Sequence, residues 1–121
     1  SYSYDKKEDK LTAVSNYNLP SKVQGVAFDD NGSIYLSTSY GRNNSSYLKV
    51  YSSLLSLDKK PNEPKVKVEM PPCSEEVAIA DGTVFVLFES ASAKYFEGTD
   101  GMGKSPAPID KLLEVSVASI W

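Results

Sequence analysis

The chain has 121 residues, a formal charge of −3 and a composition of 40% hydrophobic, 11% aromatic and 24% charged residues. These values describe one folded domain and argue against an intrinsically disordered chain. No apolar run approaches the roughly 20 residues that a membrane helix needs, so no membrane span is predicted. Twelve scattered lysines and a single arginine, Arg42, do not form the basic cluster of a nucleic-acid surface, so no nucleic-acid partner is predicted.

Cysteine and histidine usage narrows the chemistry. Cys73 is the only cysteine, and there is no histidine. An intrachain disulfide is therefore impossible, and a four-ligand zinc site is disfavoured. Without histidine the commonest general base is missing, so any catalysis would run on carboxylates, Tyr or Lys, and no catalytic residue can be named. We expect Cys73 to be a small buried side chain, and we predict no cofactor.

The N-terminal segment alternates in a way that predicts strands. Ser1–Asp5 alternates Ser and Tyr, and a charged turn follows it. Leu11–Leu19 places mostly apolar residues on one side with a period of two, and Pro20 ends the run. The chain opens with polar residues, without an initiator Met or the apolar core of a signal peptide. We interpret it as a mature or excised piece that carries no targeting segment.

The first complete unit spans Val23–Tyr51. Asp30-Asn31-Gly32 forms its turn, because Asn-Gly tolerates positive φ. Alternating Lys and Glu with Val at Lys65–Met70 predicts a half-exposed edge strand beyond a link at Leu54–Pro64. The other expected elements of this unit are the strands Val23–Asp29, Ser33–Tyr40 and Ser46–Ser52 and the loop Gly41–Ser45.

A second, looser copy follows. Its expected elements are the strand Glu76–Ala80, the turn Asp81-Gly82, the strand Thr83–Glu89, the polar loop Ser90–Pro108 and the strand Leu112–Val117. Superposing the copies places Tyr35 on Phe85, and places Val26 on Val77, which lies 51 residues later. That period is close to the roughly 40–50 residues of propeller blades. No helix is predicted.

The fold class that these units predict is all-β, with β-propeller blades in about two four-stranded antiparallel units. Ile34–Leu36 and Val84–Phe88 are apolar on both faces, as the central strands of a blade between two neighbours must be. Residues 1–20 would end a preceding blade, 21–70 would form one full blade, and 71–121 would form the final blade. Because a ring needs about 4–8 blades, we expect the remaining blades of a longer propeller, or another copy of the chain, as partners.

The blade motif itself resembles a known family. The stretch LPSKVQGVAFDDNGSIYLSTSYGRNNSSYLKVYS resembles the blade of NHL-type and related six-bladed propellers, in which Pro-x-Gly-Val-Ala precedes Asp-x-x-Gly-x-Ile-Tyr-Val. It is also similar to uncharacterised secreted bacterial propeller proteins that carry SYGRN and FES segments. The resemblance covers residues 19–120 and implies a propeller fold and a secreted or cell-surface location. It does not select a function, since propellers host lactonases, cyclotransferases and binding modules for proteins and sugars.

Strand polarity predicts where a site would lie. In an up-and-down meander, the starts of the inner strands (Ser21–Gln24 and Cys73–Glu76) fall on the same face as the loops Tyr40–Ser45 and Ser90–Pro108. The opposite face carries plain turns such as Asp29–Gly32, which lacks the alternating spacing of a calcium loop. The ligand-binding candidates are the polar residues of the loop face: Gln24, Tyr40, Arg42, Asn43, Glu75, Glu76, Glu89, Lys94 and Tyr95.

Three of these candidates carry open alternatives. Arg42 would either clamp a ligand carboxylate or phosphate bidentately or tie its loop to Glu89. Glu75 and Glu76 also have two possible roles. They would supply a metal ligand or a general acid, or they would accept hydrogen bonds from backbone amides around the central channel of the propeller.

Two function classes follow from the candidates. The first is an extracellular or cell-surface binding module that recognises a protein or small-molecule ligand through the loop face. The second is a metal-assisted hydrolase or lactonase in which carboxylates hold a divalent cation at the channel mouth. The second would be favoured if Glu75 or Glu76 converged with Glu89 on one point with an ion between them.

Overall fold

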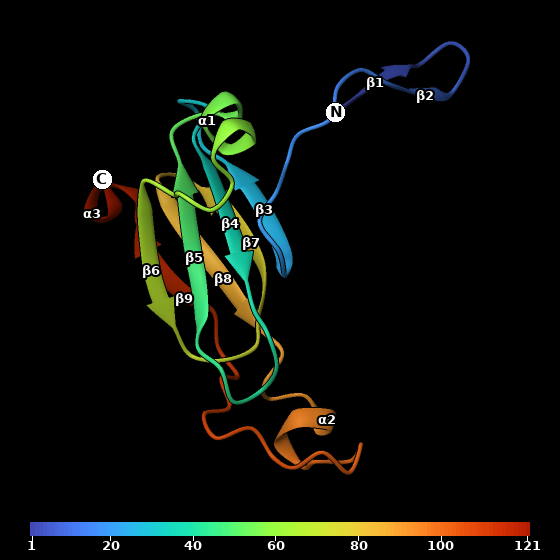
Figure 1. Cartoon of the computed structure of the whole chain (residues 1–121). Coiled ribbons are helices and arrows are strands. Elements are labelled where there is room, and N and C mark those ends of the chain that lie inside the picture. Colours follow the sequence, from blue (N-terminus) through green and yellow to red (C-terminus); the bar gives the residue numbers. More distant parts are fainter.

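The computed structural model describes residues 1–121 and is built mainly of strands, with 39% strand and 12% helix. All strand pairs are antiparallel, which confirms the predicted all-β class. The expectation of no helix is wrong, because three short helices are present, none of them long and apolar enough to cross a membrane. The elements are β1 (Tyr2–Asp5), β2 (Lys10–Ala13), β3 (Val23–Phe28), β4 (Ile34–Thr38), β5 (Ser46–Tyr51), α1 (Leu54–Lys59), β6 (Val66–Met70), β7 (Ser74–Ala80), β8 (Thr83–Phe88), α2 (Ala93–Phe96), β9 (Leu113–Ser116) and α3 (Val117–Ile120) (Figure 1).

The strands form three sheets in sequence order: β1-β2, β3-β4-β5-β6 and β7-β8-β9. The predicted turn between β3 and β4 reverses the chain because the Asp29 side chain accepts hydrogen bonds from the backbone N–H groups of Asn31 and Ser33, both at 2.9 Å. Gly32 follows at φ +81°, a conformation that glycine adopts without strain. The first unit is thus a four-stranded meander, as expected from its turns.

The second unit repeats the pairing of the first in detail. Val26 lies opposite Leu36, and its counterpart Val77 lies opposite Val86. Each leading strand also carries one extra residue just before that pair, between Val23 and Gly25 in β3 and between Ser74 and Val77 in β7. The repeat seen in the sequence therefore extends to the position of a β-bulge.

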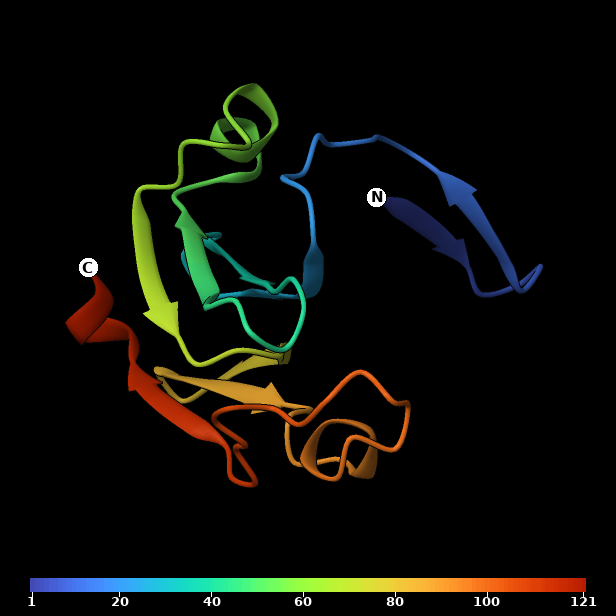
Figure 2. The same cartoon turned by 60° about the horizontal axis from the view of Figure 1, so that its bottom comes forward.

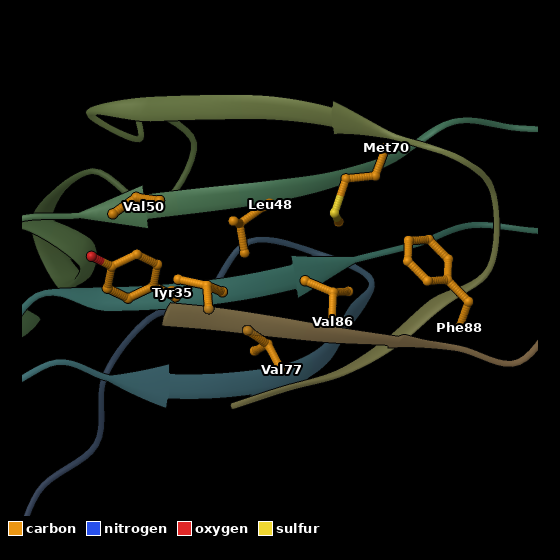
Figure 3. Packing of buried hydrophobic residues seen from close by; sticks show 8 residues of the cluster. Tyr35, Leu48, Val50, Met70, Val77, Val86 and Phe88 are labelled. Carbon is orange, nitrogen blue, oxygen red and sulfur yellow. The ribbon is translucent and has the colours of Figure 1, made fainter. Parts of the chain in front are cut away.

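The two larger sheets pack face to face around a shared core. Its buried residues come from both sheets and are Tyr35, Leu48, Val50, Met70, Val77, Val84, Val86 and Phe88 (Figure 3). The leading strands β3 and β7 approach closely at Gly25. A Cβ at this position would lie 2.7 Å from Glu76 Oε1 and 2.8 Å from the Glu75 carbonyl oxygen. Only glycine permits this approach between the sheets.

The outer face of the first sheet is partly covered by α1. Ile34, Leu36 and Tyr51 pack there with Leu57 of that helix. The helix begins after Ser53, whose hydroxyl accepts from the Ser56 backbone N–H while Ser56 Oγ accepts from that of Ser53, a capping box. The segment Leu54–Pro64, expected as a plain link, therefore begins with a helix that buries the outer side of β4.

The outer face of the second sheet has no such cover. Leu87 is 49% exposed and Phe85 is half-buried, so the expected burial of Val84–Phe88 on both faces does not occur within this chain. These two side chains line an apolar groove of about 450 Å³ together with Glu76, Ala78 and Leu112.

The N-terminal hairpin stands apart from both packed sheets (Figures 1 and 2). β2 ends at Ala13, so the strand predicted over Leu11–Leu19 is wrong in its second half. Residues 1–14 are all exposed, and no neighbouring strand pairs with residues 14–20. Residues 14–20 are held to α1 by Asn18, whose backbone N–H and side-chain amide donate to Asp58 Oδ1 at 2.7 and 3.1 Å.

Candidate functional site

One end of the two packed sheets collects the segments that strand polarity assigned to a common face. The starts of β3 and β7, the β4–β5 loop and the loop after β8 all lie at this end, the lower end in Figure 1. They enclose a pocket of about 310 Å³, here called the loop-face pocket. Its lining residues are Lys22, Gln24, Ser39, Tyr40, Gly41, Cys73, Glu89 and Tyr95. Four of the nine candidates, Gln24, Tyr40, Glu89 and Tyr95, are therefore brought together.

Cys73 is fixed at the inner side of this pocket. It is 3% exposed and has φ +68°, and its thiol donates to the Gly41 carbonyl oxygen at 3.9 Å. Burial raises the pKa of the thiol, and the nearby Glu89 raises it further. Cys73 is thus a buried, protonated side chain, as expected, and not an activated nucleophile.

Hydrogen bonds to the first sheet hold the β6–β7 connection, which carries Cys73. The backbone N–H of Ser74 donates to Ser46 Oγ at 2.9 Å, and the hydroxyls of Ser37 and Ser74 share a buried hydrogen bond of 2.7 Å. The Glu89 backbone N–H donates to the Cys73 carbonyl oxygen at 3.0 Å. These bonds set the position of Glu89 relative to the first sheet.

Two acidic residues of this end, Glu75 and Glu89, form no ion pair. The ion pairs of the chain are Arg42–Asp100 and Lys60–Glu63, so Glu75 and Glu89 are in none. Burial raises the pKa of Glu75, and the negative charges of Glu89 and Glu76 raise it further. Two carboxylates therefore lie near each other at this end outside any ion pair, while Lys22 lines the pocket and Lys94 lies next to it.

Glu76 takes the structural role left open for it. Its Oε1 accepts a hydrogen bond from the Val77 backbone N–H at 3.0 Å, which is the predicted pairing with a backbone amide. Its side chain lies over Gly25, at the contact between β3 and β7. Glu76 does not line the loop-face pocket.

Arg42 is tied to Asp100, so the predicted pairing with Glu89 is wrong. Its Nη2 donates to Asp100 Oδ2 at 2.6 Å and its Nη1 to Asp100 Oδ1 at 3.2 Å. Nη1 also donates to the carbonyl oxygens of Gly103 and Lys94, at 2.6 and 3.4 Å. The side chain is only 8% exposed, so its planar fork holds the loop Ser90–Pro108 and is not free for a ligand.

The geometry of that loop explains the change of partner. Gly98, Gly101 and Gly103 all have positive φ and turn the chain back after α2, which brings Asp100 to the guanidinium. The hydrogen bonds from Arg42 and from the Met102 backbone N–H hold the pKa of Asp100 below its usual value.

Tyr95, on α2, has two cations close to its ring. The Arg42 guanidinium is 4.6 Å from its ring centroid, and the Lys94 ammonium is 5.0 Å away. Its pKa is raised, first by hydrogen bonding with Glu89 and then by burial. Lys94 is exposed next to the pocket, whereas Asn43 is exposed and does not line it.

Sequence reasoning missed several residues of this end. Lys22 lies within the expected segment Ser21–Gln24, and its ammonium is 4.6 Å from the centroid of the Tyr40 ring, so its position could have been inferred. Asp100 carried no comparable signal, because only the folded loop brings it back to Arg42.

No three His, Cys, Asp or Glu side chains lie close enough together to hold a metal ion. Glu75 and Glu89, two carboxylates of the hydrolase alternative, lie close enough for the charge of Glu89 to raise the pKa of Glu75, and that alternative stays a prediction. Comparison with protein-family models, with curated proteins and with solved structures finds no match.

Proposed function

We propose that the two packed sheets are neighbouring blades of a β-propeller that serves as an extracellular or cell-surface binding module. The shared register and the shared bulge position support two copies of one structural unit. In a propeller the first strand of each blade lies nearest the central axis, and here β3 and β7 are the strands that meet at Gly25. The extracellular location follows from the sequence resemblance alone.

The outer faces support further blades, or a second copy of the chain, as partners. The second sheet carries the groove described above. The first sheet has an apolar groove of its own, of about 340 Å³, on its outer face. In it, Val26 and Phe28 are 49% and 53% exposed. Two sheets that are apolar on their outer sides as well as between them correspond to two units taken from a ring.

Association of the isolated chain tests this assembly. We expect light scattering to show association, because both grooves would otherwise face water. Leu87→Ser and Phe28→Ser should each reduce it. The matched control is Leu55→Ser, since Leu55 is 61% exposed on α1 but lines neither groove. A wild-type chain that stays monomeric at high concentration would contradict the proposal.

The loop-face pocket is the proposed ligand site, and the convergence of four segments on it is the observation that carries this assignment. The pocket combines the Glu89 carboxylate, the Gln24 amide and the rings of Tyr40 and Tyr95. Because Glu89 and the nearby Glu75 have no cationic partner, the site suits a ligand that donates hydrogen bonds, such as a hydroxyl-rich saccharide.

A glycan array probed with the chain tests the ligand class. Once a glycan is retained, Glu89→Gln should weaken its binding by removing a charged acceptor. Glu97→Gln should not, because Glu97 is exposed beyond α2 and outside the pocket. Equal effects of the two changes, or no retained glycan, would count against the site.

A further inference from the structure

A second hollow adjoins the loop-face pocket and differs from it in charge. It has a volume of about 370 Å³ and opens between the turn before β3, the end of β4, the β4–β5 loop and β5. Its lining residues are Ser21, Lys22, Thr38, Ser39, Tyr40, Asn44, Ser45, Tyr47 and Lys49. We call it the lysine hollow. No Asp or Glu lines it, and apart from the two lysines its polar side chains carry hydroxyl groups and one amide.

The cations at this hollow have no carboxylate partner. Neither Lys22 nor Lys49 takes part in the ion pairs of the chain. The Lys22 ammonium lies 4.6 Å from the centroid of the Tyr40 ring, an attraction that leaves its positive charge in place. The nearest acidic side chain of β6, Glu69, accepts a hydrogen bond from Ser45 Oγ at 2.7 Å and is not part of the lining.

A third lysine adds charge to the same side. Lys67 on β6 lies directly opposite Lys49 on β5, and its ammonium is 4.1 Å from the centroid of the Tyr47 ring. Like charges directly opposite each other destabilise an antiparallel pair. Burial and the charge of Lys67 together lower the pKa of Lys49. The strand pairing therefore carries a cost that a bound anion would offset.

We propose that the lysine hollow binds the anionic group of a small ligand, a sulfate, phosphate or carboxylate, through Lys22 and Lys49. An ammonium donates charge-assisted hydrogen bonds to such oxyanions, and the hydroxyl of Ser39 adds a neutral donor, whereas the hydroxyl of Ser45 is already donated to Glu69. The size of the hollow admits a group as large as an acidic sugar. The site is separate from the loop-face pocket, although Lys22, Ser39 and Tyr40 form a shared wall.

Heteronuclear NMR titration of the full chain tests the proposal. The probes are sodium sulfate, a hexose phosphate and a uronic acid, with the neutral hexose as control and sodium chloride keeping the ionic strength constant. We expect saturable shifts at the backbone amides of Lys49, Ser45 and Tyr40 with at least one anion and none with the neutral sugar. The anion that binds tightest identifies the group recognised.

Two variants and one control locate the binding. Lys49 lies on β5 and Lys22 in the turn before β3, and the changes Lys49→Gln and Lys22→Gln should each weaken anion binding about tenfold or more. Lys111→Gln removes an exposed lysine far from the hollow in sequence and should leave affinity unchanged. Glu89→Gln, which tests the loop-face pocket, should also leave anion binding intact. Equal weakening by Lys111→Gln and Lys49→Gln, or the absence of saturable shifts with every anion, would overturn the proposal.

Discussion

The hydroxyl of Tyr35 accepts a hydrogen bond from the indole N–H of Trp121 at 2.8 Å and donates one to Asp29 Oδ2 at 3.0 Å. Tyr35 is fully buried in the shared core, and Trp121 is the last residue of the chain. Helix α3 makes this contact possible by turning the chain back after β9, with Val117 and Ile120 packed against the core. The Tyr35–Trp121 bond thus fastens the second sheet to the first hairpin.

Replacing Tyr35 with Phe tests this fastening. Tyr35→Phe keeps the ring in the core but leaves the Trp121 N–H without its acceptor and Asp29 without one donor. We expect the free energy of unfolding to fall by about 1–2 kcal/mol, the usual cost of a lost hydrogen bond with its partner left behind. Urea unfolding measures it. Tyr47→Phe is the control, because Tyr47 is half-buried and its hydroxyl forms no hydrogen bond within the chain. An equal loss in both variants would mean that the hydroxyl network is not what holds the sheets.

Acid should loosen the loop Ser90–Pro108 before the sheets unfold. The pKa of Asp100 is lowered from 3.8 by its hydrogen bonds, first from Arg42. A lowered folded-state pKa gives stability that is present above pH 3.8 and is lost as pH falls through the folded-state value. The protection factors of the amides of residues 98–103, corrected for the intrinsic exchange rate at each pH, should therefore fall below about pH 3.8, while those in β4 and β8 should not. Unchanged protection of the loop at low pH would show that Arg42–Asp100 does not order it.

The conservative change Arg42→Lys separates the two roles considered for this residue. Lysine cannot reproduce the paired donation to Asp100 Oδ1 and Oδ2 or the contact with Gly103. We expect faster proteolysis within Ser90–Pro108 and a lower melting temperature. A variant with the wild-type melting temperature but weaker ligand binding would restore the ligand-clamp interpretation.

Neutralising Glu75 should stabilise the protein near neutral pH. Its pKa is raised above 4.5 by burial and by Glu89 and Glu76. For an acid, a raised folded-state pKa means that ionisation costs stability above that value, and that the cost is absent below pH 4.5. Glu75→Gln should therefore raise the melting temperature at pH 7 and change it little at pH 4. The control Glu114→Gln, at an exposed position of β9, should show no such difference. A fall in melting temperature at pH 7 would contradict the electrostatic account.

The hairpins and the loop face could be predicted because local rules decide them. Asp-Asn-Gly fixes a turn wherever it occurs between strands, and once the turns are known the strand polarity places Gln24 and Glu89 at the same end. The all-β class followed from the same signals.

What could not be predicted depended on contacts distant in sequence. α1 is six residues long, and its Leu57 is buried only because β4 offers an apolar outer face. Asp100 meets Arg42 58 residues away through a loop turned by glycines. The strand expected beyond Ala13 fails to form because no neighbouring strand pairs with it. Propensity alone decides none of these cases.

Gly25 controls the approach of β3 to β7, and its replacement is the sharpest test of the packed pair. In Gly25→Ala the new Cβ would meet Glu76 Oε1 at 2.7 Å, the Glu75 carbonyl oxygen at 2.8 Å and Glu76 Cα at 2.9 Å. Its φ is not positive, so alanine adds a steric conflict without a backbone penalty. Because two of the three atoms belong to the backbone, the sheets must separate. We expect a loss of about 1–3 kcal/mol in the free energy of unfolding, the usual cost of overpacking.

A second change shows whether the backbone causes that loss. Glu76→Ala removes Oε1 but leaves the Glu75 carbonyl oxygen and Glu76 Cα in place. The double variant Gly25→Ala/Glu76→Ala should therefore recover only part of the stability, measured against Glu76→Ala alone by urea unfolding. Full recovery would assign the conflict to a movable side chain. Unchanged stability in Gly25→Ala itself would mean that β3 and β7 are not held as closely as this packing requires, and the proposed two-blade arrangement would lose its central contact.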